Sequence, residues 1–216
     1  MTDSHADTRK ASDLFIECLE AEGCEYIFGV PGEENLDFLD SLSRSKQIKL
    51  VLTRHEQGAG FMADGYARLG GKPGVCVLIS GPGVTNACTP MGQSFADSIP
   101  VLVISSTTAS YSLGKGWGCL HEVTDLEAVT RPLTALSATA RSPDDLEELI
   151  GQAFSIFASE RPRPVHIAVP IDVLAQAVST TWQRRTVPSR PAPAGSAIRE
   201  AAELLRQAER PLIYAG

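Results

Sequence analysis

Short apolar segments alternate with segments of helical periodicity from Ser12 onward. Tyr26–Val30 is a compact apolar run, whereas Glu33–Leu42 carries its apolar residues at helical spacing. Strands this short and apolar, separated by helices, are typical of parallel sheets, because the helices cover both sheet faces. The sequence therefore predicts an α/β fold with an open, doubly wound, mainly parallel sheet and helices on both faces.

The same periodicity places the remaining elements. Strands are expected at 26–30, 48–53, 75–80, 100–105 and 165–169, and helices at 33–42, 56–69, 84–97 and 142–159. Residues 107–124 are rich in Gly, Ser and Thr and show neither helical nor strand periodicity. They are expected to form a long loop of the kind that often carries function.

Composition narrows the classes of protein and partner. The chain has 216 residues, 43% of them hydrophobic, which excludes a disordered chain. Its net charge of −7 argues against nucleic acid, and no apolar run approaches the roughly 20 residues of a membrane helix. The five cysteines form an odd set without a Cys-x-x-Cys pair, so we expect neither a disulfide framework nor a metal site, and a cytoplasmic location.

The chain divides by composition. We expect a flexible tail over 1–11, one domain over 12–185, a Pro-rich linker over 186–195 and the truncated start of a further, central domain over 196–216. The last part comprises an expected helix from Ser196 to Ala208 and an apolar strand at Pro211–Tyr214. One helix and one strand cannot bury a core of their own.

Glycine-rich or polar turns follow the first three predicted strands, at Gly29–Gly32, Arg54–Gly58 and Ser80–Gly83. The carboxyl ends of parallel strands meet at one edge of the sheet, where helix N-termini and loop amides bind ligands. Ordinary turn chemistry is the alternative for each motif taken alone. Together they predict a site at this edge.

Glu56 has two interpretations. Thr53–Glu56 matches a capping box, in which Thr53 and Glu56 satisfy free backbone groups at a helix start, but a carboxyl group here could equally be catalytic. His55 and His121 are either structural or catalytic, and His166 is expected to be packed within a strand.

Several motifs, taken in order, closely resemble the N-terminal domain of thiamine-diphosphate enzymes of the acetolactate synthase type. They are GVPGEENLDFLD, LTRHEQGAGFMADGYARLGGKPGV, SGPGVTN, FADSIPVLVIS, TRPLT and RPRPVHIAVPIDV. The resemblance runs from about Ser12 to Val173. It implies that residues 12–185 bind the aminopyrimidine ring of thiamine diphosphate.

The resemblance also implies which residues form the site. Glu56 would hydrogen-bond the pyrimidine ring and favour the imino tautomer that removes the thiazolium proton. A carboxyl group shielded from water can share a proton with a weakly basic ring nitrogen. Further cofactor contacts would come from Val30, Pro31, Gly32, Ser80, Pro82 and Asn86.

The resemblance implies partners beyond this chain. Family members bind the diphosphate and Mg²⁺ through a later domain with a Gly-Asp-Gly motif, which this chain lacks. FAD is a further cofactor of some relatives. The family's site forms between two subunits, so we expect a homodimer or homotetramer acting on a small 2-oxo acid, and a chain inactive alone. The alternatives are a noncatalytic remnant or binding module, and one subunit of a split enzyme.

Three departures separate the chain from biosynthetic acetolactate synthases. It has Ser105-Ser106-Thr107 in place of Thr-Gly-Gln, Leu120-His121-Glu122 in place of Phe-Gln-Glu, and Ala135 in place of Lys. The segment SLGKGWGCLHE resembles instead the family's 5-guanidino-2-oxopentanoate decarboxylases. His121 and Glu122 are therefore expected near the substrate, with Glu122 and Asp125 available to pair with a guanidinium group.

Overall fold

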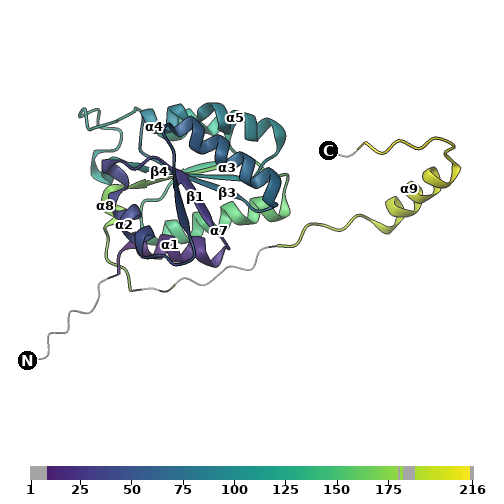
Figure 1. Ribbon diagram of the computed structural model, residues 1–216, viewed down its shortest axis with the longest axis horizontal. Coiled ribbons are helices and arrows are strands. Elements are labelled where there is room, and N and C mark those ends of the chain that lie inside the picture. Colours follow the sequence, from purple (N-terminus) through teal and green to yellow (C-terminus); the bar gives the residue numbers. More distant parts are fainter. Residues whose placement is uncertain (1–8, 180, 182–187, 215–216) are drawn as a thin grey trace, which may run out of the picture.

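A six-stranded, entirely parallel sheet organises the chain (Figure 1). The computed structural model describes residues 9–179, 181 and 188–214, and within them the strand order is β2-β1-β3-β4-β6-β5. The strands are β1 (Tyr26–Gly29), β2 (Lys49–Leu52), β3 (Gly74–Leu78), β4 (Val101–Thr107), β5 (Leu136–Thr139) and β6 (Val165–Pro170). The predicted open parallel α/β architecture is confirmed.

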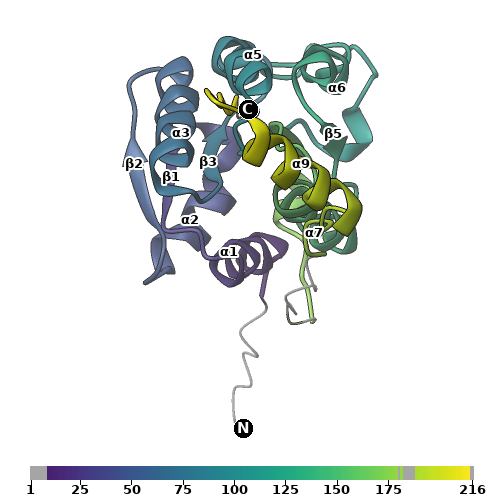
Figure 2. The same cartoon turned by 90° about the vertical axis from the view of Figure 1, so that its right-hand side faces the viewer.

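Helices cover both faces of the sheet (Figures 1 and 2). One face carries α1 (Ala11–Ala21), α2 (Leu36–Arg44), α7 (Pro143–Ser159) and the short α8 (Ile171–Leu174); the other carries α3 (Glu56–Gly70), α4 (Pro82–Asn86), α5 (Cys88–Asp97) and α6 (Leu126–Thr130). Phe15, Phe38 and Phe154 fill the larger core, beneath the first group. Apolar side chains thus leave water on both sides of the sheet, which is the main driving force for this layered arrangement.

The second face is packed with small residues. Ala59, Gly60, Ala63 and Ala67 are the buried face of α3, together with Asp64. Short side chains let this helix lie close to β3, and Met91 of α5 completes the cluster. Asp64 is neutralised by Arg68, whose Nε lies 2.5 Å from Oδ1, and accepts a hydrogen bond from Ser94. This packing fixes the axis of α3, at whose first position Glu56 stands.

The N-terminal boundary differs from the expected one. Residues 1–8 lie outside the described part of the chain, but residues 9–11 of the expected tail belong to the domain. Lys10 forms an antiparallel bridge with Ala177, and Ala11, the first residue of α1, is fully buried. The Lys10 amine also donates a 2.7 Å hydrogen bond to Asp37, which raises the pKa of Lys10. The polar composition of the segment concealed these contacts.

Two expected elements need correction, and one strand was missed. The helix expected at 84–97 is two helices, α4 and α5, because Pro90 has no N–H to donate to the carbonyl four residues earlier. Residues 211–214 are not a strand, since no strand among the described residues pairs with them. The edge strand β5 was not expected, because its four half-buried residues, LSAT, have no strong apolar signal.

The C-terminal part makes little contact with the sheet domain. Helix α9 (Gly195–Gln207) has no buried residue and lies apart from the layers in Figure 1. Its apolar side chains, including Ile198 and Leu204, are exposed. Residues 186–187 of the expected linker are outside the described part, and residues 188–194 have no regular structure. No helix in the described residues is long and apolar enough to cross a membrane.

His166 makes the stability of the domain depend on pH. The ring is fully buried in β6, beside Ser105, Thr130 and Ser137, and burial lowers its pKa from 6.5 to about 4. Between these two pH values the imidazole is protonated in the unfolded chain and neutral in the folded domain. The contribution of neutral His166 to the free energy of unfolding is therefore complete above pH 6.5 and is lost as the pH falls towards 4. We expect a loss of about 2 kcal/mol in the free energy of unfolding between pH 7 and pH 5.

Urea unfolding of the wild type and of His166→Gln at both pH values measures this effect. Glutamine retains a donor and an acceptor for the same hydroxyl groups but does not titrate. The variant should therefore lose less stability on acidification than the wild type. An identical pH dependence in the two proteins would show that His166 is not the titrating group.

Candidate functional site

The turns singled out by the sequence lie at the carboxyl edge of the sheet. Strand register places Gly29 of β1 opposite Leu52 of β2 and Val77 of β3. The Thr53 amide donates a 2.9 Å hydrogen bond to the Gly29 carbonyl, which ties the two exits together. The three motifs therefore begin side by side, as parallel pairing of their strands requires.

Glu56 does not act as a cap. The N-cap of α3 is His55, whose Nδ1 accepts a 3.1 Å hydrogen bond from the Gln57 amide, and the Thr53 hydroxyl donates instead to the His55 carbonyl. Glu56 is half-buried, and its Oε2 accepts a 2.9 Å hydrogen bond from Asn86 Nδ2. The capping-box interpretation is wrong for this helix, and the carboxyl group is held by Asn86 at the sheet edge.

Asn86 reaches Glu56 because α4 starts directly after a tight turn. Pro82 is the first residue of α4, and Gly81 before it has a φ of 47°. A Cβ on Gly81 would overlap the carbonyl oxygen of His121, so only glycine fits at this position. The hydroxyl of buried Ser80 donates to the same carbonyl at 3.5 Å. The turn after β3 therefore packs against the loop after β4.

The turn after β1 is locked by Asn35. Its Oδ1 accepts a 3.0 Å hydrogen bond from the Gly32 amide, and its Nδ2 donates to the Val30 carbonyl at 3.4 Å. Asn35 itself is buried, while Pro31 is exposed at the edge. Val30, Pro31 and Gly32 are thus held in a fixed turn, where backbone groups can meet a flat ligand.

Glu34 is a site residue that the sequence reasoning missed. Its side chain is only 7% exposed, and its Oε2 accepts a 2.9 Å hydrogen bond from the Ser80 amide. The same oxygen lies 3.7 Å from His121 Nδ1, a buried atom without a hydrogen-bond partner among the described residues. Glu34 therefore joins the turns after β1 and β3 to the long loop. Two adjacent acidic residues directly after Gly32 were the available signal.

The carboxylate of Glu122 is bound by the backbone of the long loop itself. Its carboxylate accepts hydrogen bonds from the amides of Gly116, Gly118 and Cys119, at 2.7–3.0 Å. Asp125 is likewise engaged, as the N-cap of α6 through the Ala128 amide. Glu122 thus uses both oxygens on the backbone of the long loop, and Asp125 uses Oδ1 on the first turn of α6.

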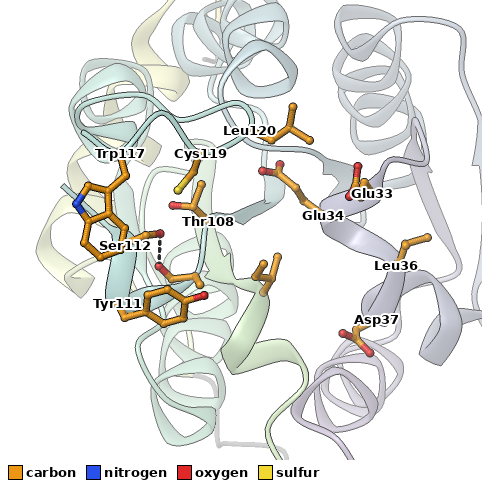
Figure 3. A pocket seen from close by; sticks show the side chains of 12 residues that line it. Glu33, Glu34, Leu36, Asp37, Thr108, Tyr111, Ser112, Trp117, Cys119 and Leu120 are labelled. Carbon is orange, nitrogen blue, oxygen red and sulfur yellow. Dashed lines mark hydrogen bonds between the residues drawn. The ribbon is translucent and has the colours of Figure 1, made fainter. Parts of the chain in front are cut away.

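A cavity of about 570 Å³ opens beside these turns (Figure 3). One wall comes from residues 33–37, and the facing wall comes from the loop after β4, with Tyr111, Trp117 and Cys119. Glu34 belongs both to this cavity and to the contact with Ser80. The cavity and the Glu56–Asn86 pair are therefore parts of one sheet edge. Among the described residues, no group of three or more His, Cys, Asp or Glu side chains is placed to hold a metal ion.

The chain is similar in sequence to known proteins. The chain is 54% identical to a probable 2-ketoarginine decarboxylase, AruI, of Pseudomonas aeruginosa over 211 residues, which are 97% of this chain and 38% of that protein. It is 38% identical to an acetolactate synthase of Mycobacterium bovis, over 93% of this chain and 33% of the relative. It is 37% identical to the large subunit of acetolactate synthase isozyme 1 of Escherichia coli, over 97% of this chain and 38% of the relative.

The chain thus spans 33–38% of the length of these relatives. The family model described as thiamine pyrophosphate enzyme, N-terminal TPP binding domain, matches residues 9–129. That range contains every turn of the sheet edge described above, from Val30 to Glu122. The chain belongs to the thiamine pyrophosphate enzymes and carries their N-terminal TPP-binding domain.

Proposed function

We propose that this chain forms the pyrimidine-binding half of the active site of a 2-oxo acid decarboxylase or acetolactate synthase-like enzyme. The observation that carries the proposal is the Glu56–Asn86 hydrogen bond at the carboxyl edge of the sheet. It leaves Glu56 outside the helix cap, with a second carboxylate oxygen that has no hydrogen bond within the described residues. A carboxyl group positioned in this way can exchange a proton with a ring nitrogen.

The residues at this edge fit the aminopyrimidine part of thiamine diphosphate. That ring offers nitrogen acceptors and an exocyclic amine. Glu56 and Asn86 provide a carboxyl and an amide group, while Val30–Gly32, Ser80 and Pro82 provide backbone groups in turns that other residues lock in place. When bound, thiamine diphosphate supplies the electron sink for decarboxylation. Glu56 would hold and move the proton at the ring, and the turns would fix the orientation of the ring.

We propose 2-ketoarginine, that is 5-guanidino-2-oxopentanoate, as the substrate. Support comes from the 54% identity to the probable 2-ketoarginine decarboxylase, against 38% and 37% to the acetolactate synthases. From the family resemblance we further propose that protein outside residues 1–216 holds Mg²⁺ and the diphosphate, and that the whole enzyme is a homodimer or homotetramer. We also propose FAD as a further cofactor of the whole protein. The 216 residues alone would have no turnover.

A chimera tests this function. Residues 1–216 replace the matching part of the Pseudomonas aeruginosa relative, and decarboxylation of 2-ketoarginine is measured as CO₂ release with thiamine diphosphate and Mg²⁺. We expect the chimera to be active and the isolated chain to be inactive. A chimera that unfolds cooperatively at a temperature close to that of the relative, yet releases no CO₂, would contradict the catalytic proposal and favour a noncatalytic binding module.

A further inference from the structure

The cavity beside the Glu56 edge has two walls of opposite chemistry (Figure 3). Glu33, Glu34 and Asp37 line one side, and the aromatic rings of Tyr111 and Trp117 stand on the other. No basic residue lines the cavity within the described part of the chain. An acidic wall that faces an aromatic wall favours a flat organic cation, which can accept both kinds of contact.

Glu34 offers one carboxylate oxygen as an acceptor at the cavity. Its side chain is 93% buried, since 7% is exposed, and its Oε2 is occupied by the Ser80 amide. Its other oxygen has no hydrogen-bond partner among the described residues, and Figure 3 shows the carboxylate extending between Glu33 and the wall that carries Thr108 and Cys119. A cationic donor on a ligand in the cavity could bind that oxygen.

The carboxylates of Glu33, Glu34 and Asp37 differ in whether another group of the protein already pairs with them. Asp37 is already paired with Lys10, whose Nζ lies 2.7 Å from Oδ1. Glu33 is exposed at the cavity and has no partner among the described residues. Glu33 and the free oxygen of Glu34 are therefore the acceptors open to a ligand cation. Trp117 and Tyr111, which are 64% and 70% exposed, offer uncovered ring faces opposite them.

We infer that this cavity binds the guanidinium end of the substrate, through Glu33 and Glu34 with stacking on Trp117 and Tyr111. A guanidinium group is planar, donates paired hydrogen bonds to carboxylates and stacks on aromatic rings. The inference deepens the proposed function and rests on it for the identity of the substrate. It assigns recognition to residues other than Glu122 and Asp125, which the structure engages in the long loop.

The test is a titration of the 216-residue chain without thiamine diphosphate. The probes are 5-guanidinopentanoate, which lacks the reactive oxo group, and 5-ureidopentanoate, in which a neutral urea group of the same shape replaces the guanidinium group. Calorimetry gives the two dissociation constants, and the NMR signal of the Trp117 indole N–H reports where the probe binds. We expect the guanidino probe to bind about tenfold more tightly, as one charge-assisted contact provides, and to shift the Trp117 signal.

Variants assign the preference to individual side chains. Glu33→Gln should lower the ratio of the two dissociation constants about fivefold, because it removes an exposed charge while the amide keeps the volume of the side chain. Trp117→Leu should lower the ratio about threefold through loss of the aromatic face. Asp37→Asn should have a smaller effect than Glu33→Gln, since Lys10 already pairs with Asp37. Glu148→Gln, on the exposed surface of α7, is the control without effect.

Four results would overturn the inference: absence of binding, equal affinity for the two probes, an unchanged ratio in Glu33→Gln, or a Trp117 signal that does not respond. A Trp117 signal that depends on protein concentration and not on probe would show that a second copy covers this wall, which also overturns it. The titration involves neither cofactor nor turnover. Failure of the chimera and failure of the cavity assignment are therefore separate outcomes.

Discussion

Replacing Glu56 by Gln in the active chimera is expected to lower the rate of 2-ketoarginine decarboxylation about 100- to 10,000-fold, the usual contribution of a positioned acid or base. Glutamine can still accept the hydrogen bond from Asn86, so the local structure should persist. What it cannot do is exchange a proton with a ring nitrogen. Exchange of the thiazolium C2 proton for deuterium, followed by NMR in the chimera, measures this step apart from decarboxylation.

Two comparisons make the Glu56 result specific. Asn86→Ala should give a smaller loss of rate, because it removes the group that orients Glu56 and leaves the carboxyl in place. Glu148→Gln removes one exposed carboxylate of α7 and should change nothing. If Glu56→Gln retained the parent rates of proton exchange and decarboxylation, Glu56 would not be the proton-transferring group.

Gly74→Ala is expected to lower the free energy of unfolding by about 3 kcal/mol, since overpacking against backbone atoms cannot be relieved by a side-chain rotation. A Cβ on Gly74 would overlap the carbonyl of Ala63, at the point where α3 lies against β3. The substitution must push α3 away from the sheet. Urea unfolding at pH 7 measures the loss, and the NMR signals of α3 report whether the helix has moved.

Gly65→Ala, in the same helix, is the matched control. Apart from its chain neighbours and the backbone of its own helix turns, no heavy atom of the described residues lies within 4 Å of a Cβ built on Gly65. Alanine is the better helix former by about 0.5–1 kcal/mol, so this variant should be as stable as the wild type or slightly more stable. Equal losses in the two variants would mean that the close approach of α3 to β3 does not control the stability of the domain.

Most of the sheet was predictable because its strands are short, apolar and separated by helices. The central strands β3 and β4 are buried at every position and stand out in the sequence. Edge strand β5, with four half-buried residues, has no such signal. The break between α4 and α5 was missed for a different reason: apolar periodicity continues across Ala87, and only the missing N–H of Pro90 marks the boundary.

The candidate site was predictable in its location and less so in its side chains. Parallel pairing brings strand exits to one edge, so the turns at Gly29–Gly32 and Ser80–Gly83 could be placed from order alone. Hydrogen bonds between residues far apart in the sequence could not be predicted in this way. Sequence spacing suggested a capping role for Glu56, yet the structure gives the cap to His55 and pairs Glu56 with Asn86, 30 residues away.

By itself the sequence determined the layered α/β fold, the edge at which the candidate site is expected and the resemblance to thiamine-diphosphate enzymes. These depend on local periodicity and on turn motifs, which a linear sequence records directly. Only the tertiary structure decided which acidic side chains are occupied and which are free. Glu122 serves three loop amides, whereas Glu34 is buried with one oxygen directed into a cavity that faces Trp117. Partner choice among carboxylates depends on distances across loops that meet only when the chain has folded.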